Sequence, residues 1–223
     1  AAGAGADFEH DVLLAGELER VEQATAHAAR FDVERDQELK LIISGKTLAP
    51  GGLRNPLVLI SNYLFDSIPQ DAFFIAEGQL FETLITLRTP QKEANPDDPE
   101  ILSRVEISYH NNLVNGDYYD DPLWNRMLQD YRQRLPGASF LFPAAALQCV
   151  QSFLRLSGGR MLLLSADRGY NRDEALLQGE GAPTITVHGS FSMMVDYQII
   201  GEYCRQLGGH ALHPAKQAES LNV

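Results

Sequence analysis

Two short, uninterrupted runs of apolar residues stand out along the chain. They are residues 56–61 (Pro-Leu-Val-Leu-Ile-Ser) and residues 160–166 (Arg-Met-Leu-Leu-Leu-Ser-Ala). Runs of this length without polar alternation are typical of strands that are buried on both faces of a parallel sheet. We therefore expect two central strands at these positions.

Segments with helical composition and clear start and stop residues separate the other elements. Pro143 suits a first helical turn, Asp196 is a good N-cap, and Gly208 and Gly209 are typical of a helix end. The expected helices span residues 8–29, 122–135, 142–156 and 196–207. Further strands are expected at residues 36–44, 79–87 and 184–188, and loops at residues 89–99 and 111–122.

The succession of helix, glycine pair, apolar strand and polar loop is typical of α/β units on a parallel sheet. The 223 residues, with a mass of 24.7 kDa, have the size of one domain. We expect a single α/β domain over residues 1–213, with a mostly parallel sheet and helices on both of its faces. Residues 214–223 are expected to form a tail or a junction to a further domain.

The charge and the cysteine content narrow the classes of partner. The 18 Lys and Arg residues are outnumbered by 30 Asp and Glu residues, so the net charge is −12. Such a chain repels a phosphate backbone, and we expect no nucleic-acid partner. No stretch approaches the roughly 20 apolar residues of a membrane span, which predicts no membrane partner. Cys149 and Cys204 are too few for a disulfide scaffold and suggest a reducing compartment, the cytoplasm.

Polar residues follow both apolar runs, where parallel sheets bind their ligands. Asn62 comes directly after the first run, and Asp66 lies one helical turn later. These two are candidates for a catalytic site, or they cap and turn the chain. After the second run, Asp167 and Arg168 form either a functional pair or a self-contained ion pair at a loop mouth.

The N-terminal residues add a weaker signal. Gly3 and Gly5 resemble the end of a nucleotide-binding glycine loop, in which absent side chains let backbone N–H groups approach a ligand. Asp32 is a candidate acceptor for an adenine amino group, or it caps a turn. The six histidines lack the spacing of known metal motifs, so we expect no metal site, and there is no GxSxG nucleophile elbow.

Three segments together resemble MidA-type S-adenosylmethionine-dependent methyltransferases, a family that includes a mitochondrial protein-arginine methyltransferase needed for complex I assembly. Residues 57–69 (Leu-Val-Leu-Ile-Ser-Asn-Tyr-Leu-Phe-Asp-Ser-Ile-Pro) are similar to its Asn-Glu-Phe-Phe-Asp-Ala-Leu-Pro motif. Residues 158–169 resemble its Gly-Gly-x-Leu-Leu-x-x-Asp-Tyr-Gly segment, and residues 195–197 its Val-Asp-Phe segment. Order and spacing agree over roughly residues 30–210.

This resemblance implies a Rossmann-like class I methyltransferase fold, S-adenosylmethionine as cofactor, and a protein side chain as acceptor. It places Gly3 and Gly5 in the cofactor loop and Asp32 against the adenine. Asn62 and Asp66 would lie beside the transferring methyl group, with Asn62 also contacting the cofactor.

Two departures from the family pattern keep a second interpretation open. The family's glutamate after the asparagine is Tyr63 here, which removes a carboxylate well suited to a guanidinium. The stretch between Gly5 and Asp32 is short for a helix, a strand and a helix, so the domain is expected to be incomplete at its N-terminus. Glu17 and Glu19 are the only candidates for the acid that grips the ribose. The alternative is a catalytically degenerate, methyltransferase-like binding or assembly module.

Overall fold

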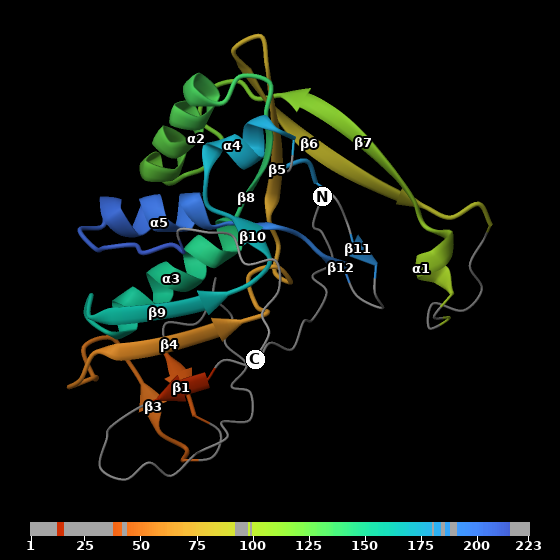
Figure 1. Cartoon of the computed structure of the whole chain (residues 1–223). Coiled ribbons are helices and arrows are strands. Elements are labelled where there is room, and N and C mark those ends of the chain that lie inside the picture. Colours follow the sequence, from red (N-terminus) through yellow and green to blue (C-terminus); the bar gives the residue numbers. More distant parts are fainter. Residues whose placement is uncertain are drawn as a thin grey trace. The chain divides into compact units, whose positions relative to one another are not determined.

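The computed structural model divides the chain into two compact units. Figure 1 shows its helices and strands with their labels. Unit 1 comprises residues 1–69 and 144–167, and unit 2 comprises residues 70–143 and 168–223. The structure describes residues 13–15, 38–41, 44–91, 98, 100–179, 181–183, 186–187 and 191–214.

Unit 1 is built on a three-stranded sheet with the order β1-β4-β9. β1 runs antiparallel to β4, whereas β4 and β9 are parallel and in register from Leu57–Met161 to Asn62–Ala166. The short strands β2 and β3 pair with each other. The elements of unit 1 are β1 (Leu13–Ala15), β2 (Leu39–Lys40), β3 (Thr47–Leu48), β4 (Leu57–Asn62), α3 (Ala144–Leu156) and β9 (Met161–Ala166).

One face of the β4–β9 pair carries exposed apolar side chains. Leu57 and Leu59 on β4 are buried, but Ile60 is 47% exposed, and Leu162 and Leu164 on β9 are 51% and 50% exposed. The expectation that both apolar runs form strands is confirmed. The expectation that both faces of these strands are buried is wrong for the residues that the structure describes.

Unit 2 contains a four-stranded sheet with the order β7-β6-β5-β8, in which all neighbours are antiparallel. Glu77 and Gly78 join β5 to β6 as a two-residue turn, with φ of 51° and 72°. Positive φ at both positions matches the right-handed twist of the strands that the turn connects. The strands of this sheet are β5 (Asp71–Ala76), β6 (Gln79–Arg88), β7 (Glu106–Leu113) and β8 (Ser139–Phe142).

Two helices of unit 2, α2 and α5, form where the sequence predicted helices, and both have an aspartate cap at their start. α2 has Pro122 in its first turn, and the Asp121 carboxylate accepts a hydrogen bond from the Leu123 amide at 2.8 Å. Asp196 caps α5, as expected, and Gly208 follows that helix with φ of 83°. The helices and short strands are α1 (Ile101–Arg104), α2 (Pro122–Arg134), α4 (Asp173–Leu177), α5 (Tyr197–Gln206), β10 (Gly169–Tyr170), β11 (Thr186–Val187), β12 (Phe191–Ser192) and β13 (Val195–Asp196).

Aromatic side chains form the core of unit 2. The ring of Phe73 on β5 stacks on Phe140 of β8, with centroids 5.5 Å apart. The rings of Tyr118 and Tyr119 meet Phe73 edge-on, and Tyr119 also packs on Trp124 of α2. Phe73 and Phe140 are fully buried. These contacts join the sheet to α2 and to the loop that precedes it.

The predicted Rossmann-like fold, with its mostly parallel sheet, is wrong. The largest sheet is antiparallel, and the described strands pair in parallel only between β4 and β9 and between β10 and β13. The cause lies in the connections. A two-residue turn such as that at Glu77 and Gly78 permits only antiparallel pairing, whereas parallel strands need a long crossover.

Several boundaries also differ from the expectations. The segment 8–29 was expected to be helical, but its described part is the strand β1. Residues 139–142 form β8, so α3 begins at Ala144 and not at Phe142. Of the expected strand 36–44, the structure describes residues 38–41 and 44, and of these the two residues of β2 are in strand conformation. Among the described residues, no helix has the length and apolar character needed to cross a membrane.

Candidate functional site at the ends of two parallel strands

The ends of β4 and β9 bring two of the three family-like segments together. Asn62 is the last residue of β4 and is paired with Ala166, the last residue of β9. Both strands run in the same direction, so the residues that follow them leave the sheet at the same edge (Figure 1). Asn62 is exposed, and Ser61, one residue earlier, is 2% exposed. The third segment, at residues 195–197, belongs to unit 2.

Tyr63 occupies an unusual backbone conformation at this edge. Its φ is 53°, in the left-handed region, which costs a bulky non-glycine residue on the order of 1 kcal/mol or more. Its amide donates a hydrogen bond to the Ala166 carbonyl at 3.2 Å, and its side chain is 65% exposed. An aromatic ring held outward in a strained conformation is not a core residue.

Asp167 links the two strand ends through the backbone. One carboxylate oxygen accepts from the Leu64 amide at 2.9 Å and the other from the Phe65 amide at 3.3 Å. The Ser165 hydroxyl donates to the same carboxylate at 3.4 Å. The sequence analysis identified Asp167 as a candidate and predicted Arg168 as its partner. The amides that Asp167 binds could not be found from the sequence, because they lie about a hundred residues away along the chain.

Asp66 lies in the turn that follows Asn62 and is largely enclosed. Its residue is 8% exposed, and one carboxylate oxygen accepts a hydrogen bond from the Ser67 hydroxyl at 2.9 Å. The Ser67 amide donates to the Leu64 carbonyl at 3.1 Å, which closes the turn. The two predicted catalytic residues therefore differ in environment, Asn62 being exposed at the end of β4 and Asp66 buried in the turn after it.

Gly3, Gly5 and Asp32 lie outside the residues that the structure describes, as do Glu17 and Glu19.

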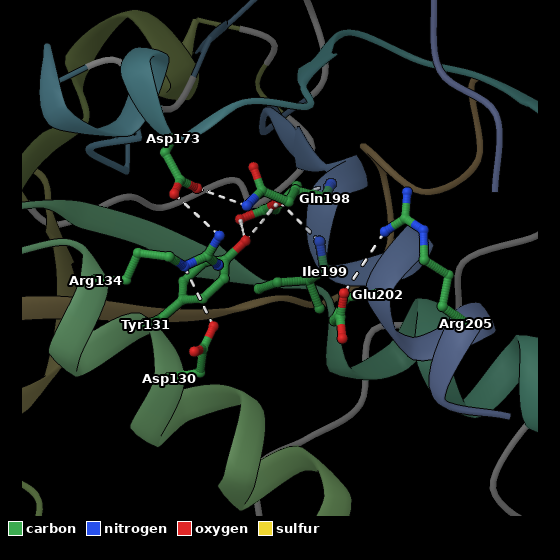
Figure 2. A network of polar contacts seen from close by, with 9 residues as sticks. Asp130, Tyr131, Arg134, Asp173, Gln198, Ile199, Glu202 and Arg205 are labelled. Atoms are coloured by element: carbon green, nitrogen blue, oxygen red, sulfur yellow. Dashed lines mark hydrogen bonds and ion pairs between the residues drawn. The ribbon is translucent and has the colours of Figure 1, made fainter.

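A polar network in unit 2 joins residues of α2, α4 and α5, among them Arg134, Asp173 and Gln198 (Figure 2). The carboxylate of Asp196 beside these helices is fully buried. This carboxylate accepts from the amides of Gln198 and Ile199 at 3.0 and 3.1 Å, and from the Tyr131 hydroxyl at 3.1 Å. Burial raises its pKa to about 7, although these hydrogen bonds act in the opposite direction. The guanidinium of Arg134 lies 4.9 Å from the centre of the Tyr131 ring. These contacts cap α5 and tie it to α2, which is a structural role.

Two tyrosines of the same unit reach carboxylates on the antiparallel sheet. The Tyr119 hydroxyl donates to Asp71 at 2.7 Å, and the Tyr118 hydroxyl donates to Glu82 at 2.6 Å. Burial raises the pKa of Asp71 despite the hydrogen bond from Tyr119, and the nearby Glu82 carboxylate adds to the rise. Burial also raises the pKa of both tyrosines. The phenols therefore remain protonated and hold their loop on the sheet.

The remaining nucleophiles and ligands give no second site. Cys149 is buried, which raises its thiol pKa to about 12, and burial also raises the pKa of Cys204. Within the described ranges, no group of three or more His, Cys, Asp and Glu residues has an arrangement that could hold a metal ion. Comparison with protein-family models finds no match to the chain, and comparison with curated proteins finds none either.

Proposed function

We propose that the chain is an S-adenosylmethionine-dependent methyltransferase that modifies a protein side chain. One observation carries the proposal: β4 and β9 are parallel and in register, so two segments that resemble the methyltransferase family end at one edge. Ligands of parallel strands bind beyond the carboxyl ends of those strands. The support is local to this strand pair and does not depend on the arrangement of the other sheets.

The polar groups at this edge suit a nucleoside cofactor. The Ser61 hydroxyl is buried and has no hydrogen-bond partner among the described residues, which is rare for a buried polar group. The next two residues along the chain, Asn62 and Tyr63, are exposed. Hydroxyl and amide groups bind the ribose and amino groups of such a ligand, and an aromatic face supports flat or cationic groups. Gly3, Gly5 and Asp32 stay proposed as further cofactor residues.

The chemistry at this edge needs little from the protein. When bound, S-adenosylmethionine supplies a methyl group that is already activated for transfer. We assign to Asn62 the orientation of the acceptor, because its amide both donates and accepts hydrogen bonds at the exposed end of β4. Asp66 is the carboxylate of the same turn and would take a proton from the acceptor.

Calorimetric titration of the full chain with S-adenosylmethionine and with S-adenosylhomocysteine tests the proposal. We expect binding of both, and a tenfold or greater loss of affinity in N62A at an unchanged melting temperature. N112A is the matched control, because Asn112 is an exposed asparagine on β7 of unit 2. Absence of binding heat in the wild type, with the protein folded, would refute the methyltransferase.

A second candidate is a binding or assembly module that does not use the cofactor. Exposed Ile60, Leu162 and Leu164 on one face of β4 and β9 favour it, because contiguous exposed apolar side chains mark interaction surfaces. We would expect the wild type to capture a stable complex and an L162S/L164S variant to lose it. If S-adenosylhomocysteine also leaves the complex unaffected, the result favours this function. A complex that forms only with the cofactor would favour the enzyme.

We also propose the cytoplasm as the compartment. Both cysteines are free thiols, as expected for a reducing environment.

A further inference from the structure

The turn after β4 contains one buried aromatic residue and one exposed aromatic residue. Phe65 is fully buried and fixes the turn to the core, whereas Tyr63, two residues earlier, is 65% exposed. Packing therefore explains the position of Phe65 but not the left-handed φ of 53° at Tyr63. Hydrogen bonds that the amides of this turn donate to Ala166 of β9 and to Asp167 hold this conformation.

We propose that Asp167 is a positioning residue of the methyltransferase site, because its carboxylate holds the two amides that follow Tyr63 and so fixes the projection of Asn62 and Tyr63 from the strand end. This inference rests on the proposed function. It adds a residue that acts through the turn and does not itself contact cofactor or acceptor.

Two hydrogen bonds to the Asp167 carboxylate define this role, and a third, to the neighbouring Ala166 carbonyl, supports it. The Tyr63 amide donates to the Ala166 carbonyl. The Leu64 amide donates to one oxygen of the Asp167 carboxylate, and the Phe65 amide donates to the other. Consecutive amides that converge on one side chain need two acceptor oxygens. An ionised carboxylate has both, whereas an asparagine side chain keeps one acceptor and turns an NH₂ group toward the second amide.

The test is a double-mutant cycle on the full chain with S-adenosylhomocysteine as the probe. We expect tenfold weaker binding in D167N and a larger loss in D167A. Glycine adopts the left-handed conformation without steric cost, so Y63G makes the turn less dependent on its carboxylate. The loss caused by D167A is therefore expected to be at least threefold smaller in the Y63G background. D120N, an exposed aspartate of unit 2, is the control for loss of one negative charge.

Hydrogen exchange at the amides of Leu64 and Phe65 separates the possible failures. Faster exchange at these amides in D167N, together with the affinity loss and its rescue by Y63G, supports the proposal. Wild-type affinity in D167N and D167A overturns it, as does an affinity loss of the same size in both Tyr63 backgrounds. If the wild type does not bind the probe, the proposed function fails. The exchange data then still show whether Asp167 holds the turn, but no positioning role remains.

Discussion

Substitution of Asn125 by alanine tests how the loop before α2 is held in unit 2. Asn125 is 6% exposed, and its side chain makes three hydrogen bonds to the backbone of this loop. Its carbonyl oxygen accepts from the amides of Tyr118 and Tyr119 at 3.0 and 2.9 Å, and its NH₂ group donates to the Tyr119 carbonyl at 2.6 Å. N125A removes all three bonds and leaves the backbone groups of this loop without them.

The expected cost follows from the number of bonds lost. A hydrogen bond contributes a net 0.5–1.5 kcal/mol, and an unsatisfied buried partner costs more. We therefore expect N125A to lower the free energy of unfolding of unit 2 by about 2–4 kcal/mol, a large fraction of the stability of a typical domain. N125D keeps two acceptor oxygens for the amides but loses the donor, so it should fall between N125A and the wild type.

Urea unfolding monitored by tryptophan fluorescence measures this loss. Trp124 is the only tryptophan of the chain, is 5% exposed, and precedes Asn125 on α2, so its signal reports on unit 2. N112A, at an exposed position on β7, is the control for the same substitution. If N125A unfolds at the same urea concentration as N112A, with the same slope, the three bonds do not stabilise the loop and the reasoning is wrong.

Two further predictions concern a buried acid and a strained turn. Because burial raises the pKa of Asp196 from 3.8 to about 7, its ionisation opposes folding. That contribution to stability is present below pH 4 and is lost as the pH rises through 7, by at most on the order of 4 kcal/mol. D196N keeps the cap but removes the titrating group. The free energy of unfolding measured in urea should therefore fall more between pH 5 and pH 8 in the wild type than in D196N. An equal fall with pH in both proteins would contradict this. E77N should raise Tm by about 2–4 °C, because asparagine tolerates the left-handed φ of Glu77 better, and calorimetry showing no rise would contradict that.

The elements that the sequence predicted well are those with local signals. Pro122 and Asp196 mark the starts of α2 and α5, and these helices begin where expected. The apolar runs became β4 and β9 for the same reason, since a few adjacent β-forming residues suffice. Such signals act over one or two turns and do not require knowledge of a partner.

The elements that the sequence missed depend on partners far along the chain. Of the residues of β8, only Phe142 was assigned an element, the start of the helix expected at residues 142–156, and residues 139–141 were given no strand. The strand conformation of β8 follows from pairing with β5, in which Asp71 lies opposite Phe142. The same limit explains the wrong fold class: apolar runs identify strands, but the connections decide whether those strands lie parallel.

The candidate site shows how a local and a distant signal combine. Asn62 ends a strand that the sequence identified, and Asp66 lies in the turn directly after it, so their proximity along the chain follows from the sequence alone. The conformation of that turn depends on Asp167, which follows a different strand and reaches the turn only because β4 and β9 are in register. A one-residue shift of this register would move Asp167 away from the Leu64 amide and release Tyr63 from its strained conformation. The site is therefore a property of the strand pair, and its function is best tested by variants that break the pair's contacts at the turn while leaving Leu57, Leu59 and the buried face intact.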